Sequence, residues 1–321
     1  MKSFFIKYLL SKIGFNRYKN IIISKDILDE SSNLIGNIPW DKDFISPVWE
    51  EVFSKFGISK FDGPLTDANI DILKSSYENF FVNGLSDGAC VGEDLKRLRT
   101  MFKYVVRGSK RLKLLNRHFK FQDPHSDPFL DLKLSPELYS GKPWVQSING
   151  ESVNPELIDH LYFFKFCQNL PISKNKLLFL GDGSGILSNI FLNNSAVEDA
   201  TFIDLPHFLI RQHIVNFNLF NVNKKYLTPN QVGDIVSDEK SYVLVTQDNL
   251  PEIPQKYLEI YFDLISKGLI TDVLSYNKRD LSFGHTDFRS ILLSKGISCL
   301  LSIESVMRPG YFLEWYSINK K

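Results

Sequence analysis

The stretch that most constrains the fold is residues 177–206, LLFLGDGSGILSNIFLNNSAVEDATFIDLP. A short apolar run precedes a loop with three glycines, an apolar-periodic segment, a second apolar run and then Asp204. This order is typical of a strand, a tight loop, a helix and a second strand that ends in an acid. Gly181, Gly183 and Gly185 would let backbone N–H groups approach a ligand closely, and the helix N-terminus behind them would favour negative charge.

The position of the acid indicates what such a loop binds. Asp204 follows Gly185 by about 20 residues, the spacing at which βαβ units hold the hydroxyls of a ribose. The alternative is a glycine-rich turn inside an ordinary βαβ unit, because a bare GxGxG pattern is weak evidence. The flanking strand, helix and acid favour a nucleotide-type site.

Composition and charge exclude several classes of protein. The chain has 321 residues, of which 43% are hydrophobic and 23% charged, so wholesale disorder is excluded. The formal net charge is +1, which does not indicate nucleic acid, and no nucleic-acid partner is expected. Three widely spaced cysteines, Cys90, Cys167 and Cys299, argue against a disulfide framework and against a metal site, and favour a reducing cytoplasm. No apolar run approaches the roughly 18 residues of a transmembrane helix.

Residues 1–140 lack a βαβ rhythm and are predicted to form a mainly helical N-terminal extension. The clearest helices are expected at 66–82 and 93–106, where apolar residues recur with helical spacing. Residues 1–20 combine apolar residues with interspersed lysines. They form either a helix docked on the body or a basic amphipathic helix that contacts a membrane surface or a partner.

A basic run occupies residues 96–120, which contain many lysines and arginines and no acid. Most such runs are solvated helix faces. Solvated faces usually mix both signs, however, so an anionic partner such as a phosphorylated substrate or a lipid head group stays open.

Residues 141–321 alternate between strands and helices. Strands are predicted at 176–180, 200–204, 225–228, 241–246 and 269–275, and helices at 155–169, 186–192, 206–220, 254–266 and 287–294. Two last strands, 297–305 and 311–318, flank the turn Met307–Gly310 and predict an antiparallel hairpin. We therefore expect an α/β domain with an open, mostly parallel sheet and helices on both faces.

A sheet that closes on such a hairpin after five βα units resembles the Rossmann-like class I S-adenosylmethionine-dependent methyltransferases. Within that class the chain resembles the bacterial sugar O-methyltransferases of surface-polysaccharide clusters. The glycine loop at 177–185, the turns Ile203-Asp204-Leu205-Pro206 and Glu252-Ile253-Pro254, and a fifth strand that ends in Asn277 carry this resemblance. It covers about residues 141–321, with the Asp-Leu-Pro and Glu-Ile-Pro turns as its more specific parts.

The resemblance implies a cytoplasmic enzyme that transfers a methyl group from S-adenosylmethionine to a sugar hydroxyl. The acceptor would be a sugar, a nucleotide-linked or lipid-linked sugar or a glycan. The residues expected to contact the cofactor are Gly181, Asp182, Gly183, Gly185, Asp204, Leu205, Asp234 and Gln247. One position departs from the pattern, since these enzymes commonly carry an acid two residues before the first glycine, where this chain has Phe179.

The catalytic residues are expected at the carboxyl ends of the strands. His285, in the polar loop after the fifth strand, is the first candidate for the base that takes the hydroxyl proton, because histidine titrates near neutral pH. Asp248 is the second candidate base, and Glu252 and Asn277 are expected to position the substrate. The alternative is that His285 has no catalytic role and is an ordinary loop histidine beside the start of a helix.

Two other functions stay open at this point. Phe179 is compatible with a protein that kept the fold, lost the cofactor and serves a structural or assembly role. The glycine loop is also compatible with a nicotinamide-dependent oxidoreductase, although the short glycine motif and the closing hairpin count against it.

Overall fold

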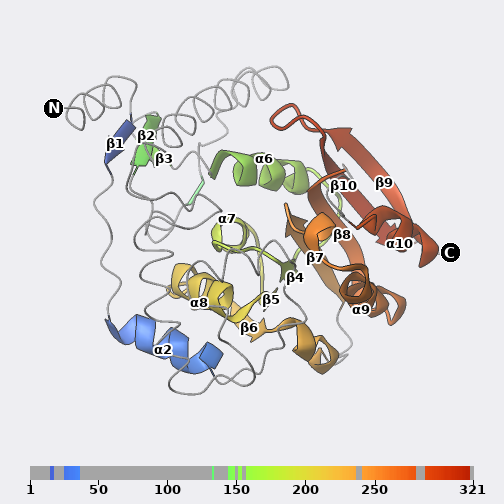
Figure 1. The fold of residues 1–321 in the computed structure, drawn as a ribbon. Coiled ribbons are helices and arrows are strands. Elements are labelled where there is room, and N and C mark those ends of the chain that lie inside the picture. The colour runs from blue at the N-terminus through green and yellow to red at the C-terminus, as the bar shows by residue number, and fades with distance from the viewer. Residues whose placement is uncertain are drawn as a thin grey trace, which may run out of the picture.

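The computed structural model describes the following parts of the chain: Phe15–Arg17, Lys25–Gly36, 132–133, Trp144–Ile148, Glu151–Val153, 157–235, 241–279 and 286–318 (Figure 1). The predicted helices at 66–82 and 93–106, the basic run at 96–120 and His285 lie outside the described residues. None of the helices in the described ranges has the length and hydropathy needed to cross a bilayer.

A seven-stranded sheet forms the centre of the molecule. Its strands follow one another in space as β6-β5-β4-β7-β8-β10-β9. The chain therefore adds β5 and β6 on one side of β4 and then crosses to the other side for β7 and β8, so the strand order reverses at β4. The strands from β6 to β8 run parallel, and β10 is antiparallel to both β8 and β9. The predicted fold class is therefore confirmed: a Rossmann-like, mostly parallel sheet that closes on an antiparallel hairpin. The strands are β4 (Lys176–Leu180), β5 (Asp199–Ile203), β6 (Asn223–Leu227), β7 (Tyr242–Gln247), β8 (Ile270–Lys278), β9 (Ile297–Glu304) and β10 (Tyr311–Ile318).

Helices cover both faces of this sheet, as Figure 1 shows. Alternate residues of β4 point to opposite faces, so Leu177 and Phe179 join one hydrophobic cluster while Leu178 and Leu180 join the other. Because both faces of the central strands β4, β5 and β7 are buried, these strands have continuous apolar centres. The first cluster includes α6 (Leu157–Gln168), α7 (Ile186–Asn194) and α8 (Pro206–Val215), and the second includes α9 (Gln255–Ser266) and α10 (Phe288–Ser294).

Two predicted bounds differ from the structure by several residues, and hydrogen bonds explain both. The helix predicted at 206–220 ends at Val215, since the side chain of Asn216 turns back and donates to the carbonyl of Gln212 (2.9 Å). The strand predicted at 269–275 continues to Lys278, because β10 pairs with it along its whole end, with Tyr311 opposite Lys278.

Phe179 is a core residue in this fold. Its side chain is 1% exposed, stacks on Phe202 with ring centroids 5.5 Å apart and meets Phe191 edge-on. The position at which related patterns carry an acid therefore contributes to packing between β4, β5 and α7.

A second, three-stranded antiparallel sheet joins β1 (Phe15–Arg17), β2 (Trp144–Ile148) and β3 (Glu151–Val153). The prediction of helix at residues 1–20 is wrong for residues 15–17, which form β1. Three residues are too few to show a periodicity, and their partner strand lies far away in the sequence. The pairing of β1 with β2 also crosses the predicted division at residue 140, so hydrogen bonds join its two sides.

A second contact ties the N-terminal part to the main sheet domain. Helix α2 (Lys25–Gly36) packs against α8, and Ser31 Oγ lies 2.7 Å from His213 Nδ1. Ser31 Oγ donates its proton to the carbonyl of Ile27 (2.7 Å), so it accepts from Nδ1–H of a neutral His213. Burial and the nearby Lys224 ammonium lower the pKa of His213 from 6.5 to about 4.

This contact predicts that the free energy of unfolding decreases as the pH falls below about 6.5. A histidine whose folded-state pKa is lowered stabilises the fold fully above about pH 6.5 and loses that contribution as the pH falls towards 4. We expect roughly 2–3 kcal/mol to be lost across this range. Urea unfolding of the wild type and of His213→Gln at several pH values isolates this contribution, since other titrating groups are shared. A difference between the two proteins that does not change with pH would contradict the prediction.

Candidate functional site

The glycine loop turns the chain from β4 into α7 at the carboxyl edge of the sheet. Gly181, Gly183 and Gly185 have φ angles of 67°, 51° and 75°. A side chain in this left-handed region costs about 1–2 kcal/mol, which explains glycine at each of these positions. Gly185 is also the N-cap residue of α7, so the loop leads directly into a helix N-terminus.

The turn after β7 lies directly on this loop. A Cβ atom at Gly181 would lie 2.2 Å from Cγ and Nδ2 of Asn249, so the Asn249 carboxamide contacts the glycine itself. Asn249 Oδ1 is buried and has no hydrogen-bond partner among the described residues. At Gly183 a Cβ would meet nothing within 4 Å, so the second glycine borders open space.

Asp204 links the second strand to the glycine loop. It directly follows β5 and is 9% exposed. Its Oδ2 accepts from Gly183 N (2.9 Å) and from Gln212 Nε2 (2.7 Å), and its Oδ1 accepts from Leu205 N (2.8 Å). A carboxylate offers about four acceptor positions, so Asp204 has acceptor capacity that none of the described residues uses. Burial raises the pKa of Asp204 to about 6 against these three hydrogen bonds, which lower it.

Asp182, another predicted cofactor residue, accepts hydrogen bonds from the first turn of α7. Its Oδ1 accepts from Leu187 N (3.2 Å) and its Oδ2 from Ser188 N (3.0 Å), so the carboxylate caps the first turn of α7. Burial is the main cause that raises the pKa of Asp182 to about 7, and the nearby Asp204 carboxylate raises it further.

Six of the eight predicted cofactor residues form one group, while Gln247 lies on a neighbouring strand and Asp234 in a separate 3₁₀ helix. Gly181, Asp182, Gly183, Gly185, Asp204 and Leu205 lie together at the carboxyl ends of β4 and β5. Gln247 ends the neighbouring strand β7, where His160 Nδ1 of α6 lies 3.1 Å from its Oε1. Asp234 ends the 3₁₀ helix η5 (Pro229–Asp234), and its side chain lies outside the described residues. His160 was missed in the sequence, because no spacing connects a helix residue to the end of a strand that follows much later.

Asp248 directly follows β7 at the carboxyl edge of the sheet, and its backbone conformation is unusual. Its φ angle is 56°, which is costly for a residue with a side chain. Arg308 Nη1 donates to Asp248 Oδ2 (2.7 Å), Tyr311 OH donates to Asp248 Oδ1 (2.6 Å), and Arg308 Nη2 donates to Tyr311 OH (2.5 Å). Sequence reasoning did not identify Arg308 and Tyr311, which come from the hairpin turn and the start of β10. The closed ring of three contacts holds a carboxylate whose side chain is still 45% exposed.

Asn277 was expected to position a substrate, but its carboxamide is committed to the protein. It is fully buried; its Oδ1 accepts from the backbone N–H groups of Asn249 (2.8 Å) and Leu250 (3.1 Å), and its Nδ2 donates to Ser275 Oγ (2.9 Å). Asn277 therefore holds the turn that places Asp248 and Asn249, and any effect on a substrate passes through that turn.

The short 3₁₀ helix η6 (Leu250–Glu252) ends at Glu252, another predicted substrate residue, which is half-buried. Beside it, Thr286 N donates to the carbonyl of Pro251 (2.9 Å) and Thr286 Oγ1 donates to the carbonyl of Ile253 (2.8 Å). The chain that re-enters the described part at Thr286 is thus anchored on η6. His285 itself stays a prediction.

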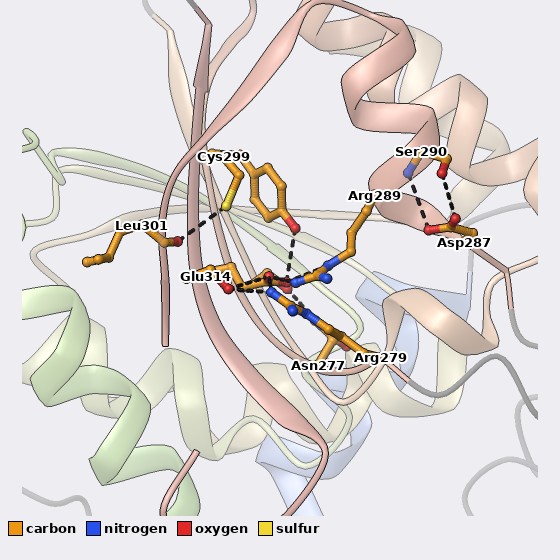
Figure 2. A network of polar contacts seen from close by, with 11 residues as sticks. Asn277, Arg279, Asp287, Arg289, Ser290, Cys299, Leu301 and Glu314 are labelled. Carbon is orange, nitrogen blue, oxygen red and sulfur yellow. Dashed lines mark hydrogen bonds and ion pairs between the residues drawn. The ribbon is translucent and has the colours of Figure 1, made fainter. Parts of the chain in front are cut away.

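A buried ion cluster stabilises the sheet next to this edge (Figure 2). Glu314 of β10 is 0% exposed and accepts from Arg279 Nη2 (2.9 Å), Arg289 Nε (3.2 Å) and Tyr316 OH (3.0 Å). Arg279 follows β8 and Arg289 belongs to α10, so one carboxylate joins two strands and a helix.

Comparison with known proteins gives a likeness in fold only. No protein-family model and no curated protein matches the chain. Solved structures that match include the fibrillarin pre-rRNA processing protein of Methanococcus jannaschii, with 12% identity, a TM-score of 0.41, and 61% of this chain and 86% of that chain covered. Magnesium protoporphyrin IX methyltransferase from Synechocystis PCC 6803, with bound S-adenosylmethionine, has 16% identity and a TM-score of 0.37. The match covers 50% of this chain and 78% of that chain. A TehB-like S-adenosylmethionine-dependent methyltransferase from Corynebacterium glutamicum has 13% identity and a TM-score of 0.39. The match covers 49% of this chain and 87% of that chain. These values are too low to carry an argument, so the fold assignment rests on the strand order.

Proposed function

We propose that the chain is an S-adenosylmethionine-dependent O-methyltransferase that acts on a sugar hydroxyl. The observation that carries this proposal is Asp204 at the end of β5, hydrogen-bonded to Gly183 N of the glycine loop. The loop follows β4, where the strand order reverses, and ligands of open α/β sheets bind at such switch points. The acid and the loop therefore lie where this fold holds a nucleoside.

The residues around the loop fit the cofactor chemically. Asp204 Oδ1 would accept from a ribose hydroxyl, and the orphaned Asn249 Oδ1 would accept from the ammonium group of the methionine part. Gln212 Oε1, on the carboxamide that donates to Asp204, is a further buried oxygen without a hydrogen-bond partner among the described residues. The site is thus rich in acceptors and suits a ligand with many donors. When bound, S-adenosylmethionine would supply an electrophilic methyl group on its sulfonium.

The chain's own residues would align the acceptor oxygen and take its proton. Asp248, held by Arg308 and Tyr311, presents a carboxylate at the carboxyl end of β7, and it stays with His285 as a candidate base. The sugar acceptor, the role in surface-polysaccharide synthesis and the cytoplasmic location rest on the resemblance carried by the turns at 203–206 and 252–254.

One observation favours a second function, a methyltransferase fold that has lost its cofactor and serves as a structural or assembly protein. Phe179 replaces the usual acid with a ring that is buried in the core. In that case the contact between Asn249 and Gly181 would only fill space, and the protein would bind no S-adenosylmethionine.

Calorimetric titration of the protein with S-adenosylmethionine separates the two functions. We expect binding by the wild type and a loss of affinity of at least about tenfold in Asp204→Ala, which removes the acceptor for the ribose and releases Gly183 N and Gln212. Glu198→Gln is the matched control, since Glu198 is exposed at the opposite end of β5. Absence of heat with the wild type would refute the proposal and favour the structural role.

The acceptor class is tested with methyl-labelled S-adenosylmethionine. Incubation with a panel of nucleotide sugars and lipid-linked sugars, followed by acid hydrolysis, is expected to yield a labelled O-methyl sugar. Transfer of label to a nitrogen or to a non-sugar hydroxyl would refute the sugar acceptor while leaving methyl transfer intact.

A further inference from the structure

We propose that His160 is the base that takes the proton of the acceptor hydroxyl, and that the Gln247 carboxamide prepares it by holding the imidazole proton on Nδ1. The two side chains come from α6 and from the end of β7, and His160 Nδ1 lies 3.1 Å from Gln247 Oε1. This inference rests on the proposed function, because it assigns a residue to the same methyl transfer.

The contact between these two side chains fixes the tautomer of the histidine. A carboxamide oxygen carries no hydrogen, so the proton in this contact belongs to Nδ1 of His160. A neutral imidazole with its proton on Nδ1 has its lone pair on Nε2, and Nε2 is then the atom that takes a proton. Gln247 is 8% exposed and His160 is partly buried, so their surroundings restrict the rotation of both side chains.

The strand register places this pair of side chains beside the glycine loop. Phe179 of β4 lies opposite Val245 of β7. Two residues further along, Gln247 is therefore level with Gly181, one strand spacing of about 4.8 Å away. Alternate residues of a strand share a face, so Gln247 projects on the same side as Val245, where α6 packs and His160 meets it. The fold thus brings the imidazole to the edge where the loop is proposed to hold the methyl donor.

The first turn of α6 also lies near the charged groups of this edge. Burial lowers the pKa of Arg308, but nearby groups outweigh it and raise that pKa above its usual value; they include Asp248 and, from this turn, Asp159. Arg308 and Tyr311 already donate to the two oxygens of Asp248 (2.7 and 2.6 Å), so a proton on this carboxylate would compete with their hydrogen bonds. The imidazole, in contrast, keeps its contact with the carboxamide oxygen when it gains a proton, since both of its ring nitrogens are then donors.

The proton taken by the imidazole is the one that the acceptor hydroxyl loses. As the acceptor oxygen bonds to the methyl carbon, its O–H bond breaks, the electron pair of that bond stays on oxygen and the proton moves to His160 Nε2. The bond from the methyl carbon to sulfur breaks at the same time, with its electron pair left on sulfur. The imidazolium keeps its Nδ1–H on Gln247 Oε1 and afterwards returns the other proton to solvent.

Nitrogen-15 NMR of the histidine side chains in the ligand-free full chain tests the tautomer, with His160→Gln used to assign the signal. We expect neutral His160 to carry its proton on Nδ1 and none on Nε2. Gln247→Glu places a carboxylate on Nδ1–H and should raise the pH at which His160 is half-protonated by about one unit. Gln255→Glu, the same substitution at an exposed position of α9 on the other face of the sheet, should leave that pH unchanged. A proton on Nε2, or a titration that does not respond to Gln247→Glu, would overturn the inference.

Kinetics with methyl-labelled S-adenosylmethionine test the imidazole as the base. His160→Gln is expected to bind S-adenosylmethionine within about threefold of the wild type and to lower kcat at least about 100-fold. In Gln247→Glu the rise of kcat with pH should move to higher pH together with the imidazole titration, whereas a purely structural role would leave the pH profile in place. Undiminished transfer by His160→Gln would overturn the inference and leave the proposed function standing. A wild type that neither binds S-adenosylmethionine nor transfers its methyl group would overturn the proposed function.

Discussion

Replacing Glu314 with glutamine is expected to lower the free energy of unfolding by about 2–4 kcal/mol. The substitution leaves Arg279 and Arg289 beside a neutral amide at a position that is 0% exposed. Both guanidinium groups retain some access to water, with side chains 35% and 23% exposed, so we expect less than the full cost of an isolated buried charge. Urea unfolding at pH 7 measures the change.

Two comparisons separate charge from shape in this cluster. Glu304→Gln removes a carboxylate from the neighbouring strand β9, where the side chain is exposed, and should change the stability by less than about 0.5 kcal/mol. The triple variant Glu314→Leu, Arg279→Met and Arg289→Met removes all three charges together and should recover much of the loss. Equal losses for Glu314→Gln and Glu304→Gln would show that the cluster is not energetically important.

Among alanine substitutions of the loop glycines, Gly181→Ala is expected to destabilise the protein most. The free energy of unfolding should fall by about 2–4 kcal/mol. Part of the loss is backbone strain, because Gly181 has a φ angle of 67°. The rest is overlap, since the new Cβ would lie 2.2 Å from the Asn249 carboxamide. The backbone of Asn249 is held by Asn277 Oδ1 (2.8 Å), so relief of the overlap requires rotation of the Asn249 carboxamide itself.

The loop offers its own control for this experiment. Gly183→Ala also places a side chain at a positive φ angle, but it meets nothing within 4 Å, so only the strain of about 1–2 kcal/mol should remain. The double variant Gly181→Ala, Asn249→Ala should regain the part due to overlap. If Gly181→Ala and Gly183→Ala lose the same amount, the contact between the loop and the turn after β7 is not tight.

Much of the fold was predictable because its signals are local. The apolar runs that became β4, β5 and β7 are short and continuous, as strands buried on both faces must be, and the helices between them have apolar periodicity. Pro206 at the start of α8 marks that helix because its missing N–H costs nothing there. Non-local pairing was not predictable, as β1 and β2 illustrate: they are three and five residues long and lie far apart in the chain.

Chain order and backbone conformation alone place an acid after the second strand and glycines after the first, so both features can be read in the amino-acid sequence. The use of those groups depends on the tertiary structure. It joins Asp204 to Gly183, turns Asp182 towards α7, places Asn249 on Gly181 and brings Arg308 and Tyr311 to Asp248. Parallel strands bring their carboxyl ends to one edge of the sheet whatever their separation in the sequence, so the hydrogen-bond partners at that edge depend on position in space.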